Sequence, residues 1–166
     1  FFGERFCRYS DLLAFYLRQP ERLAAASLGE WDRLVPIART AGLLGRLADL
    51  VEHGSGWDGV PVPVRPHLRA AAAMAEKHGR DTRYNVARLA ELLRPALGRL
   101  ILLKGAAYLC AGLPPAAGRI FNDVDILVPK RLLPHVEGIL AMGGWRLGDI
   151  TPYDEFYYRR WMHQLP

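Results

Sequence analysis

The sequence predicts an α+β protein in which a helical N-terminal region packs on a small mixed β-sheet. From the N-terminus to about residue 98, apolar residues recur at spacings of three and four, which is the period of an amphipathic helix. After Gly98, short continuous apolar runs appear between glycines, as is typical of buried strands. We therefore expect a helical region over residues 1–98 and an α/β core over residues 99–166.

Length and composition are those of a globular domain. The chain has 166 residues, 51% of them hydrophobic, which is enough to bury a core. No apolar run approaches the roughly 20 residues that cross a bilayer, and no signal-peptide pattern is visible, so we expect a cytoplasmic protein with no membrane partner. The two cysteines, Cys7 and Cys110, lie far apart and support neither a disulfide framework nor a zinc site.

The chain is basic, with a net charge of +5 that comes mainly from arginine. Such a charge suits phosphate-rich ligands but does not single them out. The arginines are scattered through helical stretches beside Asp and Glu, and no dense basic run is interleaved with aromatic residues. Nucleic acid is therefore the less favoured kind of partner.

Helices are predicted throughout the first region. Ser10 can cap the first of them, and Pro20 ends it. Residues 54–66 are rich in Gly, Ser and Pro and form a loop, while Gly79 is a point at which the last helix could divide. The predicted helices run over residues 10–20, 30–40, 43–53 and 65–97.

The second region alternates strands with helices. Its strands are recognised by short apolar or aromatic runs between turn residues. The predicted strands cover residues 100–103, 124–128, 145–147 and 155–160. The predicted helices cover residues 105–110 and 131–142, and a loop rich in Pro and Gly covers residues 112–118.

Asp123 and Asp125 form the candidate metal site. They are separated by one residue on a predicted strand, so both side chains should leave the same face. Two adjacent carboxylates repel each other unless a cation such as Mg²⁺ lies between them. Alone, however, an Asp-x-Asp pattern is more often a solvated pair of acids at the entrance of a strand.

Lys104-Gly105 adds to the evidence from the aspartates. This pair follows the apolar run 100–103, at a predicted turn from strand to helix. A glycine there lets the backbone approach a triphosphate, and the first N–H groups of a helix attract anionic oxygens. Together the two motifs predict a site that holds phosphate and metal at once.

Three segments resemble a known family. They are LLKGAA at residues 102–107, GR at 118–119 and NDVDILV at 122–128. They resemble the uncharacterised nucleotidyltransferase family of the DNA polymerase β-like superfamily, whose members show Leu-Lys-Gly-Ala, Gly-x-Arg and Asp-Ile-Asp-Leu-Leu-Val patterns. The resemblance covers nearly the whole chain, including MGGW at 142–145 and HQLP at 163–166.

The resemblance implies a polymerase β-like fold and an enzyme that uses Mg²⁺ or Mn²⁺. Such an enzyme moves a nucleoside monophosphate from an NTP to an acceptor hydroxyl and releases pyrophosphate; a protein or small-molecule acceptor is favoured over nucleic acid. Asp123 and Asp125 then bind the metals, and Gly105 lies beside the phosphates. Lys104 either contacts phosphate or pairs with one of the acids, and Arg119 either neutralises phosphate charge or orients the aspartates.

A third carboxylate belongs to this chemistry. Transferases that use two metals carry a further acid on a neighbouring strand, which helps to deprotonate the attacking hydroxyl. The family pattern places it beyond residue 166, so we expect that the sequence is incomplete at its C-terminus. Two alternatives stay open: Asp149, Asp154 or Glu155 replaces it, or the chain is a catalytically inactive nucleotide-binding or protein-interaction module.

The remaining polar and aromatic candidates have simpler explanations. The five histidines show no ligand spacing and are interpreted as surface or capping residues; they are at positions 53, 67, 78, 135 and 163. The aromatic residues between 145 and 161 could stack a base, but packing of the last predicted strand is the preferred interpretation.

Overall fold

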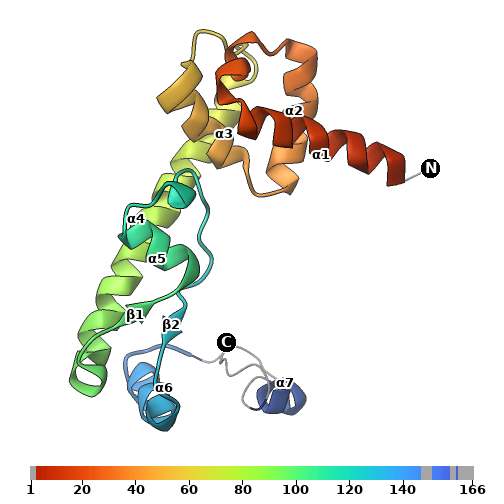
Figure 1. The fold of residues 1–166 in the computed structure, drawn as a ribbon. Helices are drawn as coiled ribbons and strands as arrows, with labels where there is room; N and C mark the ends of the chain where they lie inside the picture. The colour runs from red at the N-terminus through yellow and green to blue at the C-terminus, as the bar shows by residue number, and fades with distance from the viewer. Residues whose placement is uncertain (1–2, 147–150, 158–159, 161–166) are drawn as a thin grey trace. The chain divides into compact units, whose positions relative to one another are not determined.

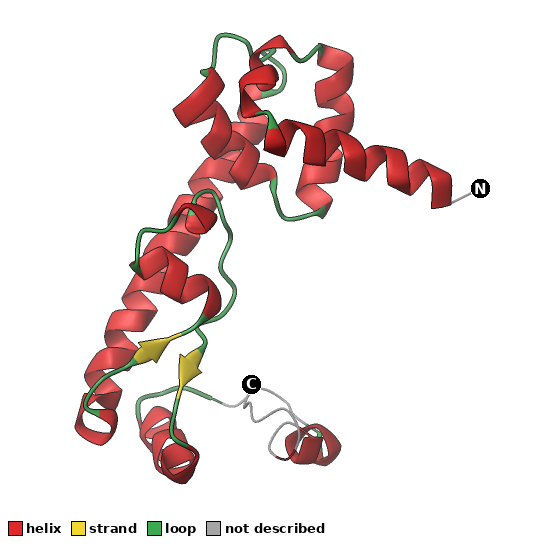
Figure 2. Cartoon of the chain, in the orientation of Figure 1, coloured by secondary structure: helices red, strands yellow, loops and turns green. Residues whose placement is uncertain are grey.

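The computed structural model describes residues 3–146, 151–157 and 160, and helices account for most of them (Figures 1 and 2). The α-helices are α1 (Gly3–Arg18), α2 (Leu28–Thr40), α3 (Leu44–Leu50), α4 (Arg65–Leu97), α5 (Lys104–Cys110), α6 (Leu133–Met142) and α7 (Pro152–Tyr157). Shorter helical turns are η1 (Pro20–Ala25), the π-helical η2 (Val51–Ser55), η3 (Pro114–Ala116) and η4 (Lys130–Leu132). Strands β1 (Ile101–Leu102) and β2 (Ile126–Leu127) pair in one small antiparallel sheet. The α+β class is thereby confirmed, whereas the predicted mixed sheet is, over the described residues, a two-stranded antiparallel one.

Residue contacts divide the chain into two compact units. The first unit comprises residues 1–86 and 102–125, and the second comprises residues 87–101 and 126–166. Helix α4 begins in the first unit and ends in the second. The predicted boundary between residues 98 and 99 stays a prediction.

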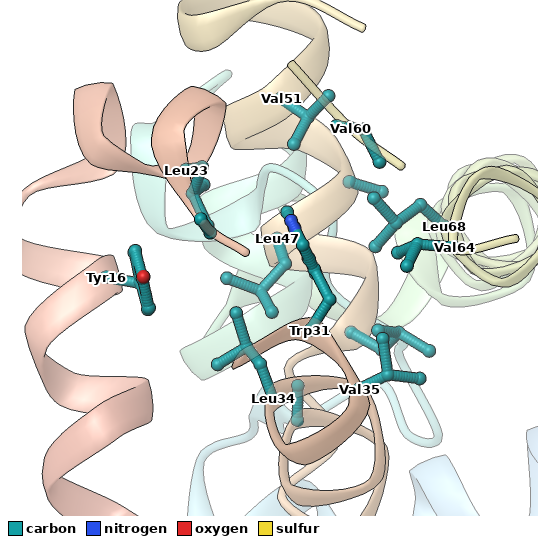
Figure 3. Close-up of a cluster of buried hydrophobic side chains, with 14 of the residues drawn as sticks. Tyr16, Leu23, Trp31, Leu34, Val35, Leu47, Val51, Val60, Val64 and Leu68 are labelled. Atoms are coloured by element: carbon teal, nitrogen blue, oxygen red, sulfur yellow. The ribbon is translucent and has the colours of Figure 1, made fainter. Parts of the chain in front are cut away.

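The core of the first unit is built by the N-terminal helices. Its largest fully buried side chains come from η1, α2, α3, η2, α4 and the loop before α4, and include Leu23, Trp31, Leu47 and Leu68 (Figure 3). Apolar burial of this extent is the main source of folding free energy. The indole Nε1 of Trp31 is buried in this cluster with no hydrogen-bond partner among the described residues.

A capping box fixes the start of α2 and joins it to α1. The Ser27 hydroxyl accepts a hydrogen bond from the Glu30 N–H, and the Glu30 carboxylate accepts one from the Ser27 N–H at 2.9 Å. The Tyr16 hydroxyl on α1 donates a hydrogen bond to the same carboxylate, with 3.0 Å between the two oxygens. The bonds from Ser27, and then that from Tyr16, lower the pKa of Glu30, while burial and the bond to Glu30 raise the pKa of Tyr16.

The predicted helices are confirmed, with differences at their ends. Ser10 lies inside α1 and does not cap it, because the helix begins seven residues earlier, at Gly3. The long helix α4 spans residues 65–97, as predicted, and Gly79 does not divide it. A Cβ at Gly79 would lie 3.8 Å from Leu109 Cδ1, so this glycine lies where α5 packs against α4. No helix among the described residues combines the length and the apolar composition needed to cross a membrane.

Two predicted strands are wrong where the structure describes them. Residues 155–157 belong to α7, not to a strand, because Pro152 suits the first turn of a helix and Tyr153 stacks on Tyr157 one turn later, with ring centroids 6.4 Å apart. Trp145 and Arg146 lie outside any strand, and the rest of that prediction, residue 147, is outside the described residues.

Candidate functional site

The two sequence motifs meet where β1 runs into α5. The Leu103 N–H donates a hydrogen bond to the Asp125 carbonyl at 2.9 Å, which continues the pairing of β1 with β2 by one step. The predicted strand of residues 124–128 is shorter in the structure, because β2 begins at Ile126, after both aspartates. Asp123 and Asp125 therefore lie on the irregular segment that leads into the strand, and not on the strand itself.

Lys104 and Asp125 form an ion pair at this junction. Lys104 Nζ lies 2.9 Å from Asp125 Oδ1, with side-chain exposures of 60% and 26%. The hydrogen bond and the charge of Asp125, with a smaller contribution from the charge of Asp123, raise the pKa of Lys104. Of the two roles predicted for Lys104, the pairing with an acid is present in the structure. Its contact with phosphate stays a prediction.

The backbone of Lys104 is unusual. Its φ is +50°, and among the described residues it is the one non-glycine residue with a positive φ. A non-glycine residue in this left-handed region costs energy; such residues are uncommon and occur in turns and at functional sites. The unusual conformation of this turn therefore lies at Lys104 and not at Gly105, which the sequence marked for close approach of a phosphate.

Gly105 serves close packing. It is buried, and an added Cβ would lie 3.2 Å from Phe121 Cδ1 and 3.5 Å from Arg119 Cζ. The Arg119 guanidinium lies over the Phe121 ring, 5.8 Å from its centroid, in a cation–π contact. Gly105 and Arg119 are therefore neighbours, as the predicted site requires. Both roles proposed for Arg119 stay open.

The loop that precedes the aspartates packs closely against α3 at two glycines, Gly118 and Gly45. An added Cβ at Gly118, whose φ is +67°, would overlap the Gly45 carbonyl oxygen, and an added Cβ at Gly45 would overlap the Gly118 carbonyl oxygen. Arg46 Nη1 also donates to the Pro114 carbonyl at 3.4 Å. Sequence reasoning missed Gly45, because a glycine inside a helical pattern gives no sign of what approaches it.

His78 holds the same segment from α4. Its Nδ1 lies 2.8 Å from the Phe121 carbonyl oxygen, and the imidazole is half-buried. A carbonyl oxygen only accepts hydrogen bonds, so Nδ1 carries the proton. The interpretation of this histidine as a surface or capping residue overlooked a contact with a residue far along the chain.

The donor set suits Mg²⁺ together with a substrate. Mg²⁺ commonly binds one or two carboxylates and completes its octahedron with phosphate oxygens and water. Asp123 and Asp125 meet that requirement, whereas no group of three or more His, Cys, Asp or Glu residues that could hold a metal occurs in the described part of the chain. Of the candidate third acids, Asp149 lies outside the described residues, and Asp154 and Glu155 lie in α7.

These features define an α+β protein in which two aspartates and a lysine meet at a strand-to-helix turn. The family model for uncharacterised nucleotidyltransferases matches residues 27–164, which include all the residues of this site. The chain therefore belongs to this uncharacterised nucleotidyltransferase family, and the resemblance seen in the sequence is confirmed. Comparisons with curated proteins and with solved structures found no match.

Proposed function

We propose that this chain is a Mg²⁺-dependent nucleotidyltransferase with a polymerase β-like core. It moves a nucleoside monophosphate from an NTP to an acceptor hydroxyl and releases pyrophosphate. Family membership supports nucleotidyl transfer in general terms. The single observation that carries the finer proposal is the Lys104–Asp125 pair, which sets a cation and a carboxylate together on an exposed turn beside Asp123.

Each residue of the site has a role in this proposal. Asp123 and Asp125 would hold Mg²⁺ or Mn²⁺, which when bound supplies positive charge at the reacting phosphate. Lys104 and Arg119 would balance the charge of the remaining phosphate oxygens. Gly105 would let Arg119 pack closely against the turn, within reach of the same phosphates. Helix α5 has only seven residues, so its dipole is given no part in the proposed binding of phosphate.

The acceptor is proposed to be a protein or a small molecule. The support is the distribution of charge: all three acids of α4 pair with basic residues, and the remaining arginines of this helix are dispersed, at positions 65, 69, 83 and 94. Three pairs on this helix, Lys77–Asp81, Arg80–Glu76 and Arg88–Glu91, neutralise one another locally. A nucleic-acid surface needs uncompensated positive charge along its length. A cytoplasmic location is part of the same proposal.

A transfer assay tests the proposed activity. The protein is incubated with Mg²⁺ and each of the four α-³²P-labelled NTPs, with a cell extract as the source of acceptors, and label that becomes attached to an acceptor is measured. Asp123→Ala should abolish the transfer, because a carboxylate that holds the metal is lost. Asp81→Ala, which removes an exposed aspartate paired with Lys77, is the matched control and should keep it.

The outcomes distinguish an active nucleotidyltransferase from a catalytically inactive module. Full transfer by Asp123→Ala would contradict the proposed site. Binding of Mg·NTP in a calorimeter without transfer of label to any acceptor would instead favour the catalytically inactive nucleotide-binding module.

A further inference from the structure

Asp123 lies between two points at which its segment is held. Two residues before it, the Phe121 carbonyl accepts a hydrogen bond from His78 at 2.8 Å. Two residues after it, the Asp125 carbonyl accepts one from Leu103 at 2.9 Å. Residues 120–125 belong to no regular element, so the Asp123 backbone is located by these two bonds, one from α4 and one that extends the β1–β2 pairing.

The Phe121 side chain is fixed as well. Phe121 is 6% exposed and clusters with Leu109 and Ala116. Its ring fills the space beside Gly105, where a Cβ would come within 3.2 Å. The buried ring fixes the position of Phe121, while the bond to His78 sets the orientation of the peptide that leads toward Asp123.

We propose that His78 is a positioning residue for the proposed metal site: from α4 it orients the Phe121 peptide and thereby the carboxylate of Asp123. This inference rests on the proposed function, since it assigns His78 to a site whose chemistry has yet to be measured. His78 acts through the backbone and does not contact the substrate. It makes the helical region a part of the site's framework.

A pair of variants isolates the hydrogen bond. His78→Asn places an amide N–H near the position of imidazole Nδ1, whereas His78→Leu has a similar size and no donor. Leucine is the better helix former of the two, so loss of helix stability cannot explain a defect that is found in the Leu variant alone. His67→Leu is the control for loss of a histidine from α4, because His67 is exposed and contacts Arg39 instead.

Two measurements are made on each variant. Hydrogen–deuterium exchange of residues 119–125 reports on the segment itself. Titration of Mn²⁺, followed by electron paramagnetic resonance in the presence of a non-hydrolysable ATP analogue, reports on the metal site. For His78→Leu we expect at least tenfold faster exchange and at least tenfold weaker Mn²⁺ binding. For His78→Asn and His67→Leu we expect both values within about threefold of wild type.

Each of the two measurements can overturn the role proposed for His78, and a separate outcome tests the proposed function. If exchange of residues 119–125 in His78→Leu equals that of wild type, the positioning role of His78 is overturned, whatever the metal result. If exchange is faster but Mn²⁺ binds all variants alike, His78 orders the segment without serving a metal, and the proposal is again overturned. If wild type binds no Mn²⁺, or if Asp123→Asn binds it as wild type does, the proposed function itself fails.

Discussion

Lys104 Nζ lies 2.9 Å from Asp125 Oδ1, so a cation already occupies one of the oxygens that the proposed metal needs. The same ammonium is required for phosphate in the proposed reaction. Lys104 therefore has two partners that compete for it, an aspartate in the free protein and an NTP in the complex. Removing the ammonium should therefore change the binding of metal and of nucleotide in opposite directions.

Lys104→Ala should bind Mg²⁺ more tightly and NTP more weakly. Without nucleotide, the variant no longer has an ammonium that competes for Asp125, and we expect Mg²⁺ affinity to rise roughly two- to fivefold, as the modest strength of an exposed pair allows. With nucleotide, a phosphate contact is lost and affinity falls. Isothermal titration measures both. Lys77→Ala, which breaks the exposed Lys77–Asp81 pair, is the control; equal Mg²⁺ affinity in both variants would contradict the prediction.

Replacing Lys104 by glycine separates backbone strain from the ion pair. Lys104→Gly and Lys104→Ala both remove the ammonium, but only glycine adopts a φ of +50° without strain. Lys104→Gly should therefore melt a few degrees higher than Lys104→Ala. Differential scanning calorimetry decides the matter, and a lower melting temperature for the glycine variant would show that the turn is not strained.

The contact between Gly118 and Gly45 should be intolerant of a single methyl group. In Gly118→Ala the new Cβ would overlap the Gly45 carbonyl oxygen, in addition to the strain of a φ of +67°. Gly112→Ala is a close control, since Gly112 has a φ of +65° and nothing within 4 Å of the added Cβ. Urea unfolding should show a loss of about 1 kcal/mol for Gly112→Ala and about 3 kcal/mol or more for Gly118→Ala. Equal losses would mean that the loop moves freely from α3.

The stability of the helical region should depend on pH through Glu30. The hydrogen bonds from Ser27, and then that from Tyr16, lower the pKa of Glu30. A lowered folded-state pKa adds stability that is present above the unfolded-state value of about 4.3 and is lost as pH falls through the folded-state value. Glu30→Gln should therefore lower the melting temperature at pH 7, and the difference from wild type should shrink below about pH 4.

Thermal unfolding of Glu30→Gln between pH 3 and pH 7 checks this. Glu21→Gln, at an exposed glutamate of η1, is the control and should shift the melting temperature little. A deficit in Glu30→Gln that stays constant over the whole range would mean that the capping box stabilises the protein independently of the carboxylate charge.

Local patterns predicted much of the fold. The long helix α4 and the regions that contain β1 and β2 were predicted from apolar periodicity and from the position of glycines, which a sequence displays directly. The strand prediction for residues 155–160 was wrong over residues 155–157, where the structure tests it against α7, because aromatic content favours strands only on average. There, the proline at the first turn and the spacing of Tyr153 and Tyr157 favoured a helix.

Long-range contacts of the site could not be predicted. The sequence marked Asp123, Asp125, Lys104, Gly105 and Arg119, but it gave no sign that Lys104 adopts a positive φ, since lysine carries no preference for that region. The contacts of Gly45 with Gly118 and of His78 with Phe121 join residues far apart in the chain. A glycine or a histidine in the sequence does not indicate which distant residue it will contact.

In the proposed function, Asp123 and Asp125 hold a metal together with a nucleotide. The most direct test of this is calorimetric titration of ATP, and of the other NTPs in turn, into wild type, Asp123→Asn and Asp125→Asn, each with and without Mg²⁺. We expect Mg²⁺-dependent binding to wild type that weakens at least tenfold in either variant, with the melting temperature unchanged. Nucleotide binding that is equally tight in all three proteins, or that does not depend on Mg²⁺, would contradict it.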